Sequence, residues 1–462
     1  MSSYSETLAQ WFTDLRYDEL PDDVIAATKL RVLDVIGLIL AACPTSLGRS
    51  AREAALAMGG GTGSRLLGFG DRATPMCAAL ANGTLSQALE FDDTHNETIV
   101  HASSPNVAAA LALGEAVGSS GRETLTIIAG AIELTVRVAL AAPGQFHKVG
   151  FHPSGIMGTF GTAYAASRLL GLDIDRIRNA AGIAGSQASG ILACWEDGTQ
   201  SKFLHPGWSA LSGIAAAFLA QAGCTGPAPV FESRFGLFAS HVQDPAYKPD
   251  LQRITAGLGE AWESRNISFK PYPAAHVIHA FVDAILHLHR NAGIRAADAE
   301  RIECPIAEYM IPVVCEPVAE KIAPATDSHG RVSLQYSLAE ALYHGRLGVD
   351  GYSETSLRNP EILALARRVT YRVDPSAPGR DQYKGWVIVH LKGGRTMERV
   401  QPNNWGSAQN PMTDDDVRAK FRENAARMLK PGQVEAIIDR VGAIEHTRTL
   451  QPLLELCVAR ER

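Results

Sequence analysis

Residues 73–95 read ATPMCAALANGTLSQALEFDDTH, an alanine-rich stretch that ends in a dense group of ionisable side chains. Apolar and small residues recur at helical spacing from Thr74 to Leu89, which predicts a helix. Six further segments follow the same pattern: Val24–Ala42, Ala51–Met58, Pro105–Val117, Arg122–Ala141, Ile156–Leu170 and Ile174–Leu192. Small side chains let helices approach one another closely. The chain up to about residue 265 is therefore expected to form a compact helical bundle.

The sequence pattern changes after Trp262. Segments rich in Val, Ile and Tyr follow, which is typical of strands: Ala299–Glu308, Arg368–Val373 and Trp386–Leu391. The residues Lys392–Arg395 predict a hairpin turn into another strand, Thr396–Val400. Helical patterns lie between the strands, at Tyr272–Arg290 and Leu334–Tyr343. This part of the chain is expected to be an α+β domain.

The C-terminal segment is helical again. Thr413 precedes Asp414–Asp416, a good cap for a helix, and a last helix is expected at Gln433–Val441. This helix is expected to return to the first domain. The predicted fold is mainly α with α+β, in which residues 1–265 and 400–462 form a large all-helical domain and residues 266–399 form a smaller α+β domain.

The composition limits the possible functions. The chain has 462 residues, 46% hydrophobic and 20% charged, which is an ordinary globular composition. The net charge of −6 gives no reason to expect nucleic acid or an anionic membrane as a partner. The seven cysteines are scattered and never spaced as CxxC, so we expect reduced thiols in a cytoplasmic protein and no cysteine-rich zinc site. The start of the chain is unlike a signal peptide, and Val35–Cys43 is the nearest approach to a membrane span of about 20 residues.

Familiar catalytic motifs do not occur in the sequence. The glycine-rich residues 59–63, GGGTG, lack the lysine of a phosphate-binding loop, so we expect a plain turn. Neither GxSxG nor HExxH is present.

The polar residues Glu90–His95, together with His101, end an otherwise apolar helix. They could form a solvated helix end, a divalent metal site, or an active-site wall that holds acid–base groups. We favour the active-site wall.

Three later clusters carry further candidates. His152 precedes a proline and a helix start, where backbone N–H groups could bind a carboxylate; we expect a half-exposed loop side chain that titrates near 6.5. Lys202 lies among small and apolar residues, and Lys270 lies in an extended segment stiffened by two prolines. His276 and His279 share a helix face. The alternative for His152 is an incidental histidine in a capping loop, and the alternative for Lys202 is a surface charge. For Lys270, His276 and His279 the alternative is a role in packing or capping.

Five segments, in order, resemble the MmgE/PrpD family, which contains 2-methylcitrate dehydratase, cis-aconitate decarboxylase and iminodisuccinate epimerase. They are ATPMCAALANGTLSQALEFDDTH, GFHPSGIMGTFG, TQSKFLHPGWSALSGIAAAFLAQAGCTGP, FKPYPAAHVIH and NPMTDDDVRAKF, which span residues 73 to about 421. The resemblance implies a large helical domain built from both chain ends, an inserted α+β domain, a homodimer, and an active site in the cleft between the domains.

The resemblance also implies the site residues: Asp93, Thr94, His101, His152, Lys202 and Lys270, with Glu90 where relatives often have Asp. The spacer in DDTHNETIVHASS is longer than in many relatives. The tyrosine of the decarboxylase is missing from Pro312–Pro317, and Tyr309 is out of register, which lowers the decarboxylase alternative.

The implied chemistry is proton transfer next to a carboxylate, with no metal and no cofactor. Lys202 and Lys270 would clamp carboxylates of a small polycarboxylate substrate, and His276 would help to bind it. His152 would transfer the proton, and His101 would be a second acid. Asp93 and Thr94 would orient His152 or the substrate hydroxyl.

We expect a hydro-lyase similar to 2-methylcitrate dehydratase. The alternatives are an epimerase or isomerase, a cis-aconitate decarboxylase, a metal-dependent hydrolase that uses Asp92, Asp93 and His95, and a non-enzymatic helical binding protein.

Overall fold

The computed structural model describes residues 2–459. Helices account for 57% of the chain and strands for 10%, which confirms the predicted fold class of mainly α with α+β. The chain divides into two compact units. Unit 1 comprises Met1–Ala88, Asp92–Ile267 and Thr413–Arg462, and unit 2 comprises Leu89–Phe91 and Ser268–Met412.

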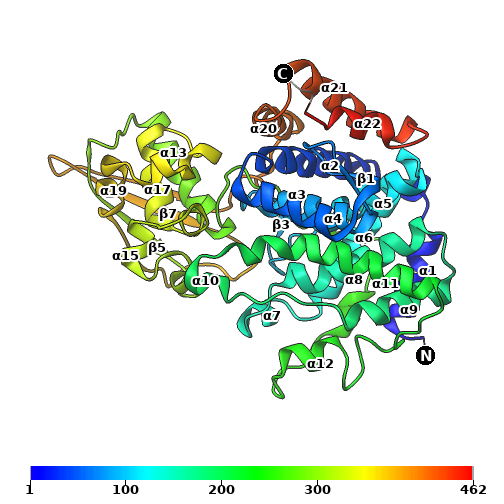
Figure 1. The fold of residues 1–462 in the computed structure, drawn as a ribbon. Helices are drawn as coiled ribbons and strands as arrows, with labels where there is room; N and C mark the ends of the chain where they lie inside the picture. Colours follow the sequence, from blue (N-terminus) through cyan, green and yellow to red (C-terminus); the bar gives the residue numbers. More distant parts are fainter. Residues whose placement is uncertain (1, 460–462) are drawn as a thin grey trace. The chain divides into compact units, whose positions relative to one another are not determined.

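Unit 1 is helical (Figure 1). Its α-helices are α1 Tyr4–Asp14, α2 Asp22–Ala42, α3 Ser46–Gly59, α4 Pro75–Gln87, α5 Ser103–Val117, α6 Gly121–Leu140, α7 Gln145–Lys148, α8 Pro153–Leu169, α9 Ile174–Gly185, α10 Cys194–Asp197, α11 His205–Gln221, α12 Leu237–Val242, α20 Asp414–Ala425, α21 Pro431–Gly442 and α22 Gln451–Leu456. Its short strands are β1 Gly60–Arg65, β2 Arg72–Ala73 and β3 Thr94–His95, and its 3₁₀ helices are η1 Tyr17–Glu19, η2 Gln200–Leu204, η3 Leu251–Ile254, η4 Glu263–Asn266 and η8 Ile444–His446. The strand β4, Ile267–Ser268, spans the change of unit.

Close helix packing in unit 1 depends on small residues. Helix α11 packs against α4 and α8, and α4 packs against α5. At the crossing of α4 and α11, a Cβ added to Gly83 would lie 2.7 Å from Cα of Gly207, so neither position accepts a side chain. Figure 1 also shows that the C-terminal helices α20 and α21 lie beside α2, although about 380 residues of sequence separate them.

Unit 2 contains a four-stranded sheet in the order β6-β5-β7-β8. Strand β5 pairs in parallel with β6 and antiparallel with β7, and β7 pairs antiparallel with β8. The strands are β5 Ala299–Ile306, β6 Val369–Val373, β7 Gly385–Leu391 and β8 Thr396–Gln401. The helices are α13 His279–Asn291, α14 Ile311–Val314, α15 Val318–Ile322, α16 Asp327–Arg331, α17 Leu334–His344, α18 Glu354–Leu357 and α19 Pro360–Ala366, with the 3₁₀ helices η5 His276–Ile278, η6 Glu308–Met310 and η7 Val349–Tyr352. Helix α13 packs on β7 and β8, and its buried Phe281 and Ile285 belong to the core of this unit.

The C-terminal boundary of unit 2 differs from the expected boundary at residue 399. After β8 the chain remains in unit 2 as far as Met412. Asp283 of α13 explains this, because its Oδ2 accepts a hydrogen bond from the backbone N–H of Trp405 at 2.8 Å. The side chain of Asn404 also lies 2.8 Å from Nε2 of His276. Both contacts tie the segment after β8 to unit 2.

Several element predictions need correction. Residues 60–65 form β1, which pairs with β2, rather than a plain turn. Helix α9 ends at Gly185, seven residues before the predicted Leu192, and α13 begins at His279 rather than at Tyr272. Prolines 271 and 273 explain the late start of α13, because a proline restricts the residue before it to extended backbone.

One helical segment, Gln200–Gln221, is long and apolar enough to cross a membrane by length and composition. It is longer than the expected nearest candidate, Val35–Cys43. In the structure 67% of its most apolar window is buried, and α11 packs against α4 and α8.

Candidate active site

His101 is held in a fixed orientation at the loop between β3 and α5. Its Nδ1 lies 2.9 Å from the backbone O of Asp93 and 3.2 Å from Oγ1 of Thr94. Oδ2 of Asp92 is 3.4 Å from the same nitrogen. The backbone N–H of His101 donates to Oγ of Ser154 at 2.9 Å, which ties the loop to the start of α8. With acceptors gathered at Nδ1, this nitrogen carries a proton.

The two aspartates beside His101 are occupied by other donors. Oδ2 of Asp93 accepts from Nη1 of Arg31 at 2.6 Å and from Oγ of Ser103. Oδ2 of Asp92 accepts from Nε2 of Gln87 at 3.0 Å and from Oγ of Ser104 at 2.9 Å. The backbone carbonyl of Asp93 and the hydroxyl of Thr94 therefore hold His101, and their role in orienting His152 or the substrate hydroxyl stays a prediction.

His152 lies at the start of α8, and its ring meets that of His205 at the start of α11. The two Nδ1 atoms are 3.0 Å apart. The ring centroid of His152 is 5.1 Å from that of His205, 5.5 Å from that of His101 and 6.2 Å from that of His147. Unit 1 thus gathers three imidazole rings around that of His152.

His152 differs from the half-exposed loop residue that the sequence suggested. Its side chain is 1% exposed, and its Nε2 is buried with no hydrogen-bond partner. Burial, reinforced by His205 and Lys202, holds the pKa of His152 well below its usual value of 6.5. Burial and then Lys202 lower the pKa of His205 to about 4. Both rings are therefore neutral at neutral pH, because burial and positive neighbours disfavour the imidazolium.

Lys202 lies in η2, one turn before α11, and is 9% exposed. It is a buried lysine rather than a surface charge, and its ammonium group acts on the pKa values of both His152 and His205. The starts of α8 and α11 add partial positive charge from their unpaired N–H groups. This region of unit 1 has the electrostatic character of a receptor for a small anion.

Two predicted site residues pair with each other in unit 2. Lys270 is fully buried, and its Nζ lies 3.2 Å from the backbone O of Glu90 and 3.5 Å from its Oε2. Glu90 adopts a positive φ of 51°, which is uncommon for a residue other than glycine. His276 lies in η5, where Nδ2 of Asn404 donates to its Nε2 at 2.8 Å and its ring packs on Tyr383.

No group of three or more His, Cys, Asp or Glu side chains that could hold a metal ion occurs among residues 2–459. The candidate ligands of the hydrolase alternative have separate partners. Asp93 is paired with Arg31, Asp92 accepts from Gln87, and Nδ1 of His95 lies 2.9 Å from Oγ1 of Thr98. The seven cysteines form no disulfide, and only Cys224 is exposed among them.

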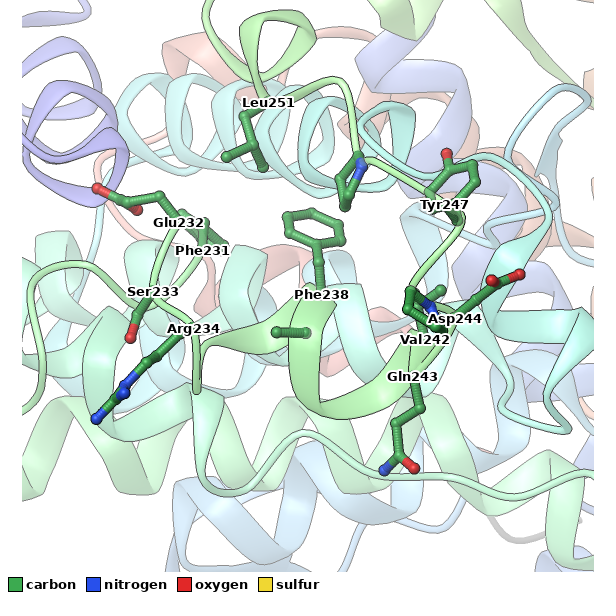
Figure 2. A pocket seen from close by; sticks show the side chains of 13 residues that line it. Phe231, Glu232, Ser233, Arg234, Phe238, Val242, Gln243, Asp244, Tyr247 and Leu251 are labelled. Carbon is green, nitrogen blue, oxygen red and sulfur yellow. The ribbon is translucent and has the colours of Figure 1, made fainter.

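A separate hollow in unit 1 contains none of the predicted site residues. It has a volume of about 520 Å³ and is lined mainly by apolar residues around α12. Figure 2 shows the ring of Phe238 in its middle and the charged ends of Glu232, Arg234 and Asp244 directed away from that ring. These features do not suit a polycarboxylate.

Sequence analysis missed two residues that meet the predicted ones. Arg31 lies in the apolar helix α2, 62 residues before Asp93, and no local pattern reveals their contact. His205 lies in the quoted segment TQSKFLHPGW, and His152 and His205 are each followed by proline at a helix start. The repeated His-Pro pair is the sequence signal that could have identified His205.

Comparisons with known proteins identify the family of the chain. The MmgE/PrpD N-terminal domain matches residues 6–250, and the MmgE/PrpD C-terminal domain matches residues 272–444. The cis-aconitate decarboxylase of Mus musculus is 28% identical over 99% of this chain and 93% of its own length. The cis-aconitate decarboxylase-like protein oryM of Aspergillus oryzae is 27% identical over 97% of this chain and 96% of its own length. The 2-methylcitrate dehydratase of Cupriavidus necator is 26% identical over 81% of this chain and 80% of its own length.

These relatives are named as decarboxylases and a dehydratase, which are lyases. The two domain matches together cover most of the chain, in the order that the sequence motifs predicted. The family resemblance is thereby confirmed, and the chain belongs to the MmgE/PrpD family.

Proposed function

We propose that this protein is a lyase for a small di- or tricarboxylic acid, and specifically a hydro-lyase of the 2-methylcitrate dehydratase kind. The reaction would remove a proton from a carbon next to a carboxylate and release hydroxide as water. The observation that carries the proposal is a pair of neighbouring imidazoles in opposite environments. His152 is buried among His205, Lys202 and the other rings, whereas His101 is backed by Asp92 and the carbonyl of Asp93.

Such a pair fits a reaction that needs a base and an acid in one turnover. The low pKa of His152 keeps its ring neutral, so its unpartnered Nε2 has a lone pair for the Cα proton. His101, whose Nδ1 lies 3.4 Å from Oδ2 of Asp92, would be the acid that donates to the leaving hydroxide. In enzymes, the acid and the base of a reaction are usually two neighbouring groups whose environments separate their pKa values.

The buried ammonium of Lys202 would bind a negatively charged carboxylate of the substrate. It lies close enough to lower the pKa of both His152 and His205, so a carboxylate bound there would face a concentrated positive charge. That charge also stabilises the enediolate-like state formed when the proton leaves. Lys270 and His276 remain proposed substrate-binding residues of unit 2. A metal-free reaction, a homodimer and a cytoplasmic location are parts of the same proposal.

Decarboxylation of an aconitate-like acid is a second candidate. It is favoured by the relatives named as cis-aconitate decarboxylases, which cover 97–99% of this chain, whereas the dehydratase of Cupriavidus necator covers 81%. Decarboxylation needs a proton donor for the carbanion but no base for a C–H bond. The paired environments of His101 and His152 therefore favour dehydration.

A proton NMR screen in deuterated buffer tests the proposal. Citrate, 2-methylcitrate, the aconitates and iminodisuccinate would each be incubated with the protein, with and without EDTA. A hydro-lyase converts a hydroxy acid into its alkene, and the reverse addition of heavy water to the alkene places deuterium on the carbon next to a carboxylate. Carbon dioxide release would support the decarboxylase instead, and exchange or inversion without elimination would support an epimerase. Absence of turnover and of exchange with every acid would refute the proposal.

A further inference from the structure

The side chains of His152 and His205 are in direct contact. The two Nδ1 atoms are 3.0 Å apart, which is hydrogen-bonding distance. A neutral imidazole carries one proton, on either Nδ1 or Nε2. One hydrogen must lie between the two Nδ1 atoms, so the tautomer of one ring decides that of the other.

This coupling acts on the reactive nitrogen of His152. When Nδ1 of His152 donates to His205, Nε2 of His152 has a free lone pair and is a base. When Nδ1 of His205 donates instead, Nε2 of His152 carries the proton and is an acid. The shift of the shared proton across this 3.0 Å contact, together with a proton gained at Nε2 of His152 and a proton lost from Nε2 of His205, therefore switches the role of His152.

The protein backbone is shaped to bring these rings together. The N–H of His152 donates to the carbonyl of Gly190 at 2.8 Å. Gly190 has a φ of +133°, and a Cβ there would lie 3.1 Å from Cγ of His205. A Cβ on Gly155 would lie 3.3 Å from Cβ of His205. Both glycines thus lie against the side chain of His205 and leave room for it.

The surroundings of the two rings set the direction in which a proton would move between them. His152 faces His101, His147, Lys202 and His205, which come from three different segments of unit 1. His152 is 1% exposed, whereas His205 is 8% exposed. Of the two rings, His205 lies nearer to solvent.

We propose that His205 is a positioning and proton-relay residue, which sets the tautomer of His152 and exchanges its proton with solvent. This inference rests on the proposed function for its catalytic consequence. In the base direction, the substrate C–H bond breaks and its electron pair stays on carbon. The proton binds Nε2 of His152, the Nδ1 proton of His152 passes to Nδ1 of His205, and the positive charge moves to His205. Return of the proton to solvent restores the neutral pair.

His205→Asn tests the relay in the full-length protein. The asparagine amide can keep a hydrogen bond near the position of Nδ1 but cannot carry a proton. We expect kcat to fall at least about 100-fold with KM changed much less, and a changed pH profile of kcat. The matched control is His241→Asn, because that ring packs on Phe146 and Phe151 and bonds to its own helix. The control should keep the wild-type rate. An active wild type together with an unchanged His205→Asn variant would overturn the relay and leave the proposed function standing.

A second measurement needs no substrate. In protein labelled with ¹⁵N-histidine, the ring nitrogens of His152 report its tautomer, and His152→Gln assigns the signals. We expect His205→Asn to shift the Nδ1 and Nε2 signals of His152 toward a single tautomer, and His241→Asn to leave them unchanged. Unchanged His152 signals in His205→Asn would overturn the inference even if the lyase activity is found. Shifted signals without any lyase activity would support the coupled pair and reject the proposed function.

Discussion

The guanidinium of Arg31 donates to Oδ2 of Asp93 at 2.6 Å, and both side chains are buried in unit 1. Arg31 also donates to the carbonyl of Ser264 at 2.8 Å. The pair anchors the loop whose Asp93 carbonyl and Thr94 hydroxyl hold His101. The Arg31–Asp93 ion pair therefore positions this loop and also stabilises the fold.

Arg31→Met should lower the free energy of unfolding by about 3–5 kcal/mol, because it leaves the carboxylate of Asp93 buried without its cation. Urea unfolding followed by circular dichroism measures this change. The exposed Arg49 is the control, and Arg49→Met should change stability by less than about 0.5 kcal/mol. The double variant Arg31→Met/Asp93→Asn should lose less than the sum of the single changes. Full additivity would show that the ion pair is not an energetic unit.

His152→Gln should reduce kcat by about 10²–10⁴-fold, the usual share of a general acid or base. Since burial, His205 and Lys202 lower the pKa of His152, the acidic limb of the wild-type pH profile should lie below 6.5 rather than near it. Steady-state kinetics between pH 4 and pH 9 on the acid found in the screen measures both effects. A wild-type limb centred at 6.5 would contradict the assignment of His152 as the base.

The stability of the protein should depend on His205 at acid pH. Its pKa is about 4 in the folded protein and about 6.5 in the unfolded chain, so only the unfolded chain binds the proton between these values. The contribution of His205 is therefore complete above 6.5 and is lost as the pH falls toward 4, by about 3 kcal/mol in total. Comparison of urea unfolding of the wild type and His205→Asn across this range isolates the effect. Parallel stability curves for the two proteins would refute it.

Lys202→Ala should lower kcat/KM by the equivalent of about 2–4 kcal/mol, the scale of one lost oxyanion donor. Lys202→Arg should not restore the wild-type rate, because the planar guanidinium cannot replace the compact ammonium in this buried position. Removal of the charge should also raise the pKa of His205, which ¹⁵N NMR titration can follow. An unchanged kcat/KM for Lys202→Ala would remove this residue from the site.

Lys270→Met should destabilise unit 2, because the carboxylate of Glu90 would remain buried without the ammonium group 3.5 Å from its Oε2. Glu90→Gln added to this variant should recover part of the loss. Chemical unfolding of the single and double variants tests the pair. If the double variant is less stable than Lys270→Met alone, Glu90 is not the main electrostatic partner of Lys270.

The sequence predicts the long helices well and the short irregular parts poorly. Helices α2, α5, α6 and α8 lie within three residues of their predicted limits, because each has a sustained apolar pattern. Strand β1 was missed because its residues, GGTGSR, have low strand propensity, and only pairing with β2 makes them a strand. Tertiary contact, which no local window contains, decided its structure.

The same reason explains which site residues could be found. His101 and His152 stand in dense polar motifs that resemble a family pattern. Arg31 could not be found, because its partner Asp93 is 62 residues away and its own surroundings are apolar. His205 was visible beside Lys202, but its role depends on a contact with His152 across 53 residues of sequence. The sequence also could not show that His152 is buried. Burial lowers its pKa, so the ring is neutral rather than half-charged near pH 6.5.

The short segment Leu89–Phe91 belongs to unit 2, although unit 1 precedes and follows it in the chain. Its Leu89 carbonyl accepts a hydrogen bond from Nη1 of Arg331 at 3.0 Å, and its Glu90 pairs with Lys270. A recombinant fragment of residues 268–412 would therefore leave two buried cations, Arg331 and Lys270, without these partners. The smaller unit is not a transferable module: grafting or swapping it between relatives requires exchange of the tripeptide at 89–91 as well.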